Sequence, residues 1–186
     1  MKPSALSRAS FAALLVAPVW IACAGGAVSP PAGFQRYTST DRGFQMDVPD
    51  GWDAVPDFPI PYGGEKLVGE AFRGPAHGGY RTNVTVVSRS VAGFTAQQVY
   101  DNEISQAGSY YPDLRVADRT LLGHAAKLFI FTMGATGDIP KVDVSEAHVI
   151  VGEAEWILTL ANLAGVRETY EPIFDQMLSS FDQVTP

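Results

Sequence analysis

The order of strand-like and helix-like segments is the feature that most constrains how this sequence can fold. Phe44, Met46 and Val48 alternate with polar residues, which is the period of a strand with one buried face. Strands are predicted in this way at 37–48, 65–73, 81–91, 114–121, 126–133, 142–151 and 155–163. One helical segment divides these strands, another ends the chain, and the later strands are spaced like hairpins. We therefore predict an α+β fold, an antiparallel sheet flanked by helices (an αβα sandwich), rather than a parallel βαβ array.

Two helices are predicted from their start signals and apolar faces. Thr95 and Gln98 form a capping-box pattern, so a helix is expected from there to about residue 106. The residues expected to be buried on its inner side are Val99, Ile104 and Ala107. The second helix accepts Pro172 in its first turn. Its single apolar face consists of Ile173, Phe174, Met177, Leu178 and Phe181.

Two segments are predicted to lack regular structure. Residues 53–64 contain three prolines and a Gly-Gly pair, a composition typical of a loop. Residues 74–79 are rich in glycine and are expected to form the tip between two strands.

The N-terminus has the three parts of a signal peptide. Lys2 and Arg8 precede an apolar stretch at 11–21, and small residues follow it. The apolar stretch is too short to span a bilayer stably, and Pro18 interrupts it. We predict that residues 1–22 are a signal peptide and that the protein is exported.

Cys23 is the only cysteine, so no disulfide can form within the chain. It follows Ala22 directly behind the apolar stretch and resembles the lipidated cysteine of a bacterial lipobox, although Trp20 and Ile21 depart from the preferred residues of that motif. We expect lipidation at Cys23, a flexible tether at 23–34, a domain at 35–186 and a membrane-anchored lipoprotein in the cell envelope. The alternative is cleavage after Ala24, which would release a secreted or periplasmic soluble protein.

The charge of the chain disfavours two classes of partner. All 20 acidic residues lie at or beyond Asp41, and removing residues 1–22 leaves 11 basic residues and a formal charge of −9. Nucleic-acid binding needs clustered Lys and Arg, which the sequence lacks. A polybasic patch for anionic lipid is absent as well, so contact with the membrane is expected through the N-terminal lipid.

Three segments together resemble the PsbP-like superfamily, which includes DcrB-type and LpqN-type bacterial lipoproteins and proteins of the Mog-type fold. Residues 43–52 (GFQMDVPDGW) resemble its first strand and Pro-x-Gly-Trp turn. Residues 121–128 (LLGHAAKL) are similar to its turn into a central strand, and 156–181 to its last strand and helix. The resemblance implies a sheet between helices. It implies no reaction, because members act as assembly factors, partner-binding proteins or envelope proteins, and no catalytic residues are shared.

The residues give little support to catalysis. His77, His124 and His148 lack zinc-ligand spacing, and no serine stands in a G-x-S-x-G frame. We therefore predict no catalytic residues, no metal and no cofactor, and assign the histidines to surface or structural positions.

Aromatic residues give the stronger binding signal. Phe58, Tyr62 and Tyr80 gather around two predicted loops, and aromatic side chains are common anchors for peptides and apolar ligands. They are our candidates for ligand or partner binding, although such residues more often pack a core or anchor a loop.

Three functions are compatible with the sequence. The first is a non-enzymatic exported lipoprotein that binds an unidentified envelope protein or assists an assembly. The second is a carrier or chaperone for a small apolar ligand, which requires a deep apolar pocket. The third is a hydrolase whose site is not visible in the sequence, which requires one of the histidines beside a serine or a carboxylate.

Overall fold

The computed structural model describes residues 29–62 and 65–184, with the side chain of Glu65 left aside. The predicted signal peptide, Cys23 and the first part of the predicted tether lie outside the described residues. Ten strands and two helices occupy the described part of the chain. The strands are β1 (Phe34–Ser39), β2 (Phe44–Pro49), β3 (Asp53–Tyr62), β4 (Glu65–His77), β5 (Tyr80–Ser90), β6 (Arg115–Leu121), β7 (His124–Met133), β8 (Val142–Val151), β9 (Ala154–Leu163) and β10 (Asp182–Gln183). The helices are α1 (Ala96–Tyr110) and α2 (Arg167–Ser180).

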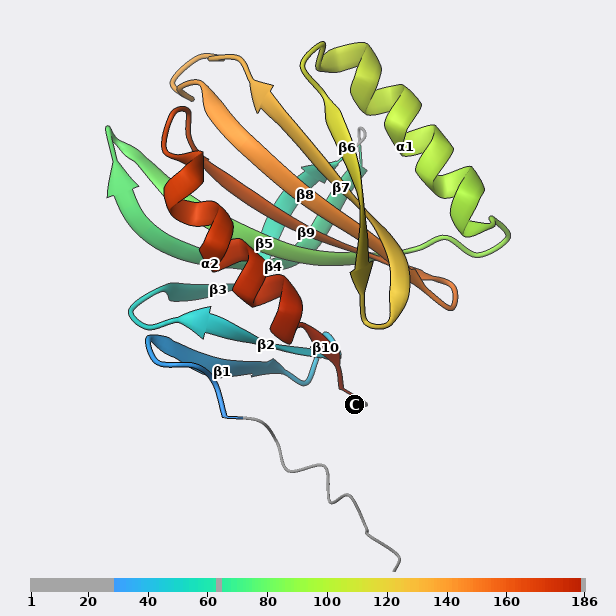
Figure 1. Ribbon diagram of the computed structural model, residues 1–186, viewed down its shortest axis with the longest axis horizontal. Helices are drawn as coiled ribbons and strands as arrows, with labels where there is room; N and C mark the ends of the chain where they lie inside the picture. Colours follow the sequence, from blue (N-terminus) through green and yellow to red (C-terminus); the bar gives the residue numbers. More distant parts are fainter. Residues whose placement is uncertain (1–28, 63–64, 185–186) are drawn as a thin grey trace, which may run out of the picture.

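Seven strands form one antiparallel sheet in the order β3-β4-β5-β9-β8-β7-β6. The other three form a small antiparallel sheet in the order β1-β2-β10, which lies beside α2 (Figure 1). Every pairing is antiparallel, and a helix packs on each face of the large sheet. The predicted α+β fold is thereby confirmed.

The main core lies on the face of the large sheet that carries α2 and the small sheet. Alternate residues of β5, β7, β8 and β9 point there, because successive side chains of a strand leave opposite faces. Phe44 of β2 packs against Trp156 of β9 and against Phe181, which follows α2, with ring centroids 6.1 and 5.8 Å apart. The predicted apolar face of α2 is buried here at Phe174, Met177, Leu178 and Phe181, and Ile173 is half-buried.

The opposite face of the large sheet carries α1 over a smaller apolar cluster made of Phe129, Phe131, Val142 and Val144. Ile104 and Ala107 of α1 pack against this cluster and are half-buried, whereas Val99 is buried as predicted. The capping box of Thr95 and Gln98 is present at the start of α1. The helix runs four residues past its predicted end.

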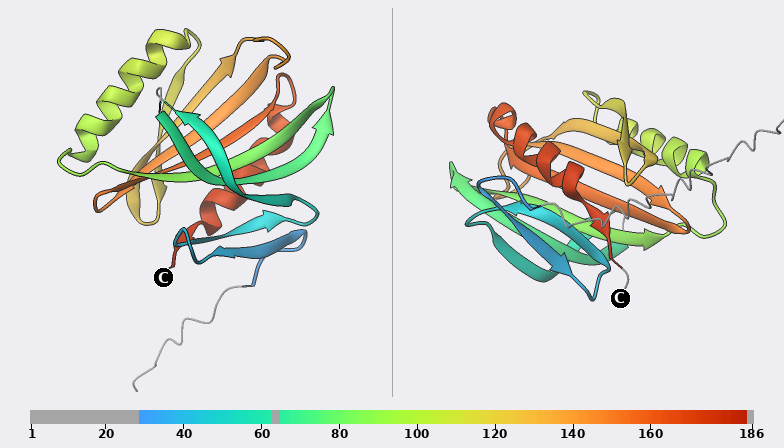
Figure 2. Two further views of the ribbon diagram at one scale, coloured as in Figure 1. Left: turned by 180° about the vertical axis from the view of Figure 1, so that it is seen from behind. Right: turned by 60° about the horizontal axis from the view of Figure 1, so that its bottom comes forward.

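The β3–β4 hairpin crosses the α1 face, with the end of β3 beside the helix (Figure 2, left). Our prediction of a loop at 53–64 was wrong, because ten of those residues form β3. Proline cannot donate a backbone hydrogen bond, but an edge strand needs only one ladder and tolerates it. β3 pairs with β4 alone and has a register shift between Val55 and Phe58.

Other boundaries also differ from the predictions. The strand predicted at 37–48 is two strands, because the chain reverses at Gly43, whose φ is +72° and whose N–H donates to Thr40 O. β4 continues to His77, so the predicted tip shrinks to Gly78 and Gly79. α2 begins at Arg167, so Pro172 lies inside the helix rather than in its first turn.

Candidate functional site

A group of charged side chains is buried between the large sheet and α1, and we call it the α1-face ionic network. It consists of Arg89 on β5, Glu103 on α1, Glu146 and His148 on β8, and Glu155 on β9. His148 and Glu155 are fully buried and Glu103 is 7% exposed. Burial of so many charges costs energy unless each is paired, and every member has a partner in the network.

His148 is held between two carboxylates. Its Nδ1 lies 2.8 Å from Oε1 of Glu155, and its Nε2 lies 2.8 Å from Oε1 of Glu146. An ionised carboxylate only accepts hydrogen bonds, so both ring nitrogens must carry protons. Burial lowers the pKa of His148, but the bonds to Glu146 and Glu155 outweigh it and raise the pKa to about 9. At neutral pH the ring is therefore an imidazolium.

Arg89 joins the sheet to α1. Its Nε donates to Oε2 of Glu155 at 2.6 Å, and its Nη2 donates to Oε1 of Glu103. Burial raises the pKa of Glu155, but hydrogen bonds and charge from His148 and Arg89 hold it below its usual value. Glu155 thus stays ionised, and its two oxygens hold His148 and Arg89 at fixed positions.

His148 and Glu155 are fully buried, and their polar atoms are bound within the network. Both nitrogens of His148 are occupied, and Thr159 donates to the second oxygen of Glu146 at 2.9 Å. Neither of the two cavities described below is lined by a network residue. The geometric requirement that we set for a hydrolase, a histidine beside a carboxylate, is met at His148, but the ring is inaccessible.

The other two histidines lie elsewhere. Nε2 of His77, at the end of β4, is 2.6 Å from the hydroxyl of Tyr170 on α2. His124 is exposed at the start of β7. Across residues 29–62 and 65–184, no group of three or more His, Cys, Asp or Glu side chains is arranged to hold a metal ion.

The structure does not bring the three predicted aromatic residues together. Tyr62, at the end of β3, donates from its hydroxyl to Oε2 of Glu103 at 2.6 Å, and the Arg89 guanidinium lies 4.9 Å from its ring centre. Burial and the nearby carboxylates raise the pKa of the Tyr62 hydroxyl. Tyr62 therefore contacts two members of the α1-face ionic network. Whether it also contacts a partner stays a prediction.

Phe58 and Tyr80 are half-buried at separate places. Phe58 lies on β3 with the guanidinium of Arg73 5.4 Å from its ring centre. Tyr80 begins β5 and packs on the small apolar cluster under α1. Their role in binding remains a prediction.

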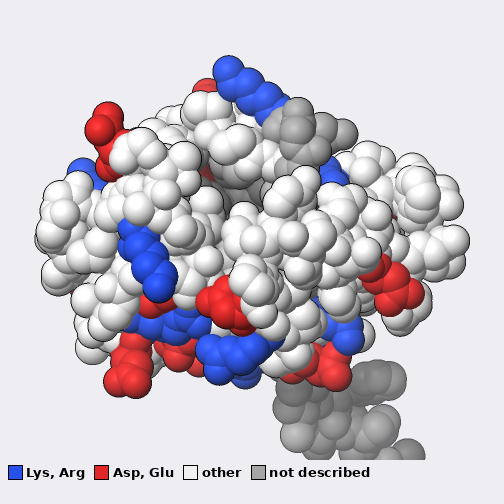
Figure 3. Space-filling model, turned by 90° about the horizontal axis from the view of Figure 1, so that it is seen from above, with Lys and Arg blue, Asp and Glu red and all other residues white. Residues whose placement is uncertain are grey.

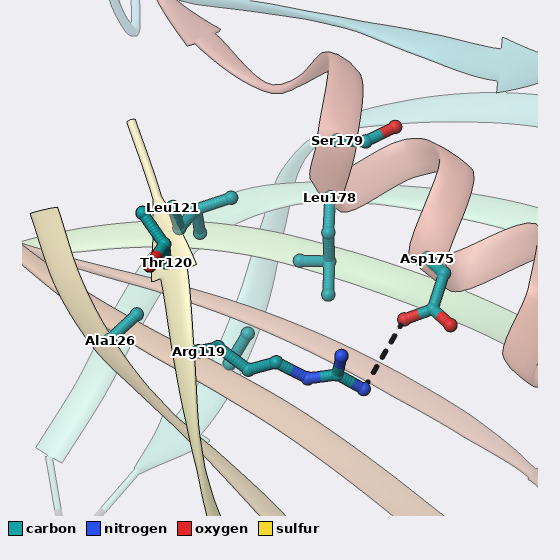
Figure 4. A pocket seen from close by; sticks show the side chains of 8 residues that line it. Arg119, Thr120, Leu121, Ala126, Asp175, Leu178 and Ser179 are labelled. Atoms are coloured by element: carbon teal, nitrogen blue, oxygen red, sulfur yellow. Dashed lines mark ion pairs between the residues drawn. The ribbon is translucent and has the colours of Figure 1, made fainter. Parts of the chain in front are cut away.

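A cavity of about 240 Å³ lies between β6 and α2, and we call it the β6–α2 cavity. Its apolar lining is Leu121, Ala126, Ala147 and Leu178. Arg119 on β6 and Asp175 on α2 reach toward each other across it, 3.7 Å apart (Figure 4). Both are half-exposed, so this ion pair adds little stability and yields easily to another partner.

A wider and more polar hollow of about 640 Å³ lies at the end of β7 and the start of β8. Arg167 occupies part of it, where it donates to Phe131 O at 3.0 Å and pairs with Asp143 at 3.2 Å. These contacts tie the start of α2 to the sheet and give the hollow a structural explanation.

The surface mixes charges of both signs. On the face seen in Figure 3, Lys and Arg alternate with Asp and Glu along one side, and most of the rest is uncharged. In the described part of the chain, no helix has both the length and the apolar character needed to cross a membrane.

Comparison with known proteins places the chain by its fold. No protein-family model and no curated protein sequence matches it. An antiparallel sheet with a helix on each face and a small sheet beside α2 is the PsbP-like α+β architecture, and solved structures of that class match the chain. The resemblance that we drew from residues 43–52, 121–128 and 156–181 is confirmed at the level of the fold.

Three solved structures illustrate the match. CyanoP, the cyanobacterial PsbP of Synechocystis sp. PCC 6803, is 18% identical with a TM-score of 0.56, over 85% of this chain and 96% of CyanoP. LpqN, involved in cell envelope biogenesis of Mycobacterium tuberculosis, is 17% identical with a TM-score of 0.52, over 82% and 91%. PA94 of Pseudomonas aeruginosa, a protein of unknown function, is 18% identical with a TM-score of 0.51, over 77% and 92%.

The ionic network was missed in the sequence, although one signal pointed to it. Glu146 and His148 continue the alternation of Val142 and Val144 along β8, so they occupy positions that point to a buried face. A charged residue at such a position is a sign of a buried pair. The spacing of the acidic residues alone favours solvent-facing positions for Glu146 and Glu155, whereas the structure buries Glu155 fully and Glu146 in part.

Proposed function

We propose that this protein is a non-enzymatic module of the cell envelope that binds a protein partner at the β6–α2 cavity. The observation that carries the proposal is the cavity itself: an apolar lining, a rim with one basic and one acidic side chain, and an ion pair that a partner can displace. This combination of an apolar centre with a polar rim is typical of protein interfaces.

The size of the cavity favours a partner side chain over a free ligand. Pockets that enclose small ligands measure about 300–1,000 Å³. At about 240 Å³ the β6–α2 cavity is smaller, and it is open to solvent. It suits one or two apolar side chains that enter from a bound protein better than a lipid or a drug-sized molecule carried inside.

The inaccessible network and the likeness to one envelope protein support the same proposal. The residues that sequence alone leaves open for chemistry, His148 and its two carboxylates, bind one another. LpqN, which shares the fold, is involved in cell envelope biogenesis.

Photocrosslinking in the native host tests the proposal. A benzophenone amino acid replaces Ser179 on the rim of the cavity, and in a matched control it replaces Ser109, an exposed residue at the far end of α1. We expect a discrete protein adduct from position 179 and none of the same mass from position 109. An adduct of lipid mass at position 179 would instead favour the carrier function. No adduct at position 179, or the same adduct at both positions, would refute the proposal.

We further propose that the chain is anchored through a lipid on Cys23. Intact mass of the mature protein from the membrane fraction tests this. Wild type should begin at Cys23 and carry acyl mass, and Cys23→Ala should lose both and leave the membrane fraction. A mature chain that begins at residue 25 without lipid would establish a secreted or periplasmic soluble protein instead.

A further inference from the structure

The two edges of the large sheet differ in whether they can accept another strand. β3 forms one edge and carries Pro56, Pro59 and Pro61 together with a register shift. Prolines and irregularities are the usual means by which proteins block an exposed edge. β3 is therefore closed to a further strand.

β6 forms the opposite edge and has neither prolines nor a register shift. It contains no proline, and it pairs with β7 in unbroken register from Arg115↔Ile130 to Leu121↔His124. Six of its seven residues are exposed, and no other strand in the described part of the chain pairs with it. The edge is thus regular and accessible along its length.

The turn after β6 identifies which backbone groups point outward. Leu122 and Gly123 form a two-residue turn with φ of +55° and +74°, the type I′ hairpin. In such a turn Leu121 and His124 are hydrogen-bonded to each other, and bonding alternates along an antiparallel pair. The inward groups therefore belong to residues 115, 117, 119 and 121. The outward N–H and C=O groups belong to Val116, Asp118 and Thr120.

The charges of β6 disfavour several of the registers in which it could pair with a second copy of the chain. Two copies of β6 would pair about a two-fold axis. Directly opposed residues share one face of the sheet, whereas neighbouring residues lie on opposite faces, so the axis must pass through a residue that lies opposite its own copy. Centred on Asp118, two carboxylates face each other; centred on Arg119, two guanidinium groups do. Centred on Ala117, Arg115 faces Arg119 twice. Like charges directly opposite are destabilising, so these three registers are disfavoured. Registers centred on Val116 or Thr120 place no like charges opposite each other, and the mass of the crosslinked adduct distinguishes such a homodimer from a different partner.

We propose that β6 accepts an extended segment of the protein partner as an eighth, antiparallel strand of the large sheet. This inference rests on the proposed function and names the chemistry of the partner. Residues opposite Arg115 and Arg119 lie in non-hydrogen-bonded pairs, where side chains approach most closely, and they should be acidic. A residue opposite Leu121 lies at the mouth of the β6–α2 cavity and should be apolar.

The partner segment therefore has a seven-residue pattern. From its N-terminus, an apolar residue lies opposite Leu121, an acidic residue two positions later lies opposite Arg119, and a second acidic residue four positions after that lies opposite Arg115; the other positions are unrestricted. The backbone of the segment would pair with the outward groups of Val116, Asp118 and Thr120. The acidic residue of the segment that lies opposite Arg119 would compete with Asp175 for the Arg119 guanidinium. Asp175 is easily displaced, because it lies 3.7 Å from Arg119 and both side chains are half-exposed. This mode of binding takes affinity from main-chain bonds and specificity from alternate side chains.

The test compares Asp118→Pro with Asp118→Ala, each in the full chain that carries the photocrosslinker at position 179. Both variants lose the Asp118 carboxylate and its ion pair with Lys127 of β7, but only proline removes an outward N–H, and neither removes a backbone hydrogen bond to β7. We expect Asp118→Pro to lower the adduct yield at least tenfold and Asp118→Ala to change it less than twofold. The double variant Arg115→Glu with Arg119→Glu, which leaves the backbone intact, should lower it at least fivefold.

The outcomes separate the two proposals. If the wild-type chain gives no adduct at position 179, the proposed function itself fails. If the adduct forms but Asp118→Pro and the Arg double variant leave its yield unchanged, the partner binds at the cavity and the edge-strand inference fails. An adduct of twice the mass of the chain would overturn it in favour of a homodimer. Sequencing of the crosslinked partner fragment should show the acidic pair four residues apart, and its absence would also contradict the inference.

Discussion

The two faces of the large sheet are stabilised by different physics. The α2 face is packed with aromatic and aliphatic side chains, among them Phe44, Trp156 and Phe181. The α1 face has a smaller apolar cluster and, beside it, charges that are paired in fixed directions. Apolar packing is non-directional and supplies most of the stability. Ionic pairing is directional, so on the α1 face it fixes how the helix and the β3–β4 hairpin lie over the sheet.

The comparison shows that the strands alone do not decide the character of a face. β8 and β9 contribute to both, with Val149 and Leu158 on one face and His148 and Glu155 on the other. Tyr100 adds a polar contact between α1 and the sheet, since its hydroxyl donates to Ala125 O at 2.9 Å. If apolar packing stabilises the α2 face and ionic pairing the α1 face, the free energy of unfolding will respond to side-chain truncation on the first face and to pH on the second.

The largest effect is expected from truncation on the α2 face. Phe44→Ala should lower the free energy of unfolding by about 3–5 kcal/mol, because the ring is fully buried and its removal leaves a cavity among Trp156 and Phe181. Urea denaturation measures the change. Phe94→Ala is the control, since Phe94 is 67% exposed, and should stay within about 0.5 kcal/mol. A loss below about 1 kcal/mol for Phe44→Ala would show that the core lies elsewhere.

The α1 face should make stability depend on alkaline pH. The folded-state pKa of His148, about 9, is above its ordinary value of 6.5, so its stabilising contribution is complete below about pH 6.5 and is lost as the pH rises through 9. The shift corresponds to roughly 3 kcal/mol. Urea denaturation at about pH 6 and about pH 9.5 should show this loss in wild type and a smaller one in His148→Gln. Equal pH slopes in the two proteins would mean that the ring is not charged in the folded state.

A smaller effect is expected where the hairpin meets the network. Tyr62→Phe removes the hydroxyl that donates to Glu103 but keeps the ring beside Arg89, and should cost about 1.5–3 kcal/mol. Tyr80→Phe is the matched control, because the Tyr80 hydroxyl only accepts a 3.3 Å bond from Asn83, and it should cost less than about 1 kcal/mol. If the two variants lose the same stability by thermal denaturation, Tyr62 does not hold the hairpin.

The strands and helices that show clear periodicity could be predicted from the sequence, and those that depend on distant partners could not. The alternation in β5, β7, β8 and β9 and the apolar face of α2 were read correctly because burial leaves a local pattern. β3 was missed because three prolines imply a loop unless the strand is known to lie at an edge. β10 is only two residues long and exists because β2 pairs with it.

The candidate site was harder to predict than the fold. The β6–α2 cavity joins Leu121 and Leu178, which lie on two elements far apart in the chain, and no sequence pattern reports such a gap. The aromatic prediction selected Tyr62, whose hydroxyl donates to Glu103 of the ionic network, and its role in binding stays a prediction. What the sequence did carry was the polar character of β6, whose charges are readable even though its edge position is not.

The arrangement of β1 has a mechanical consequence for a protein anchored by its N-terminus. β1 enters the small sheet at Phe34, which pairs with Pro49 at the open end of the hairpin. If the chain is anchored at Cys23, a force on its N-terminus would reach β1 first at the Phe34–Pro49 pair and could separate the six pairs of β1 and β2 one after another. β2 would stay in place, because it also pairs with β10 and Phe44 is buried in the core. Release of residues 34–43 would give roughly 30 Å of extra reach. If the chain is anchored through Cys23 as proposed, release of β1 would lengthen the anchor while β2 stays paired with β10.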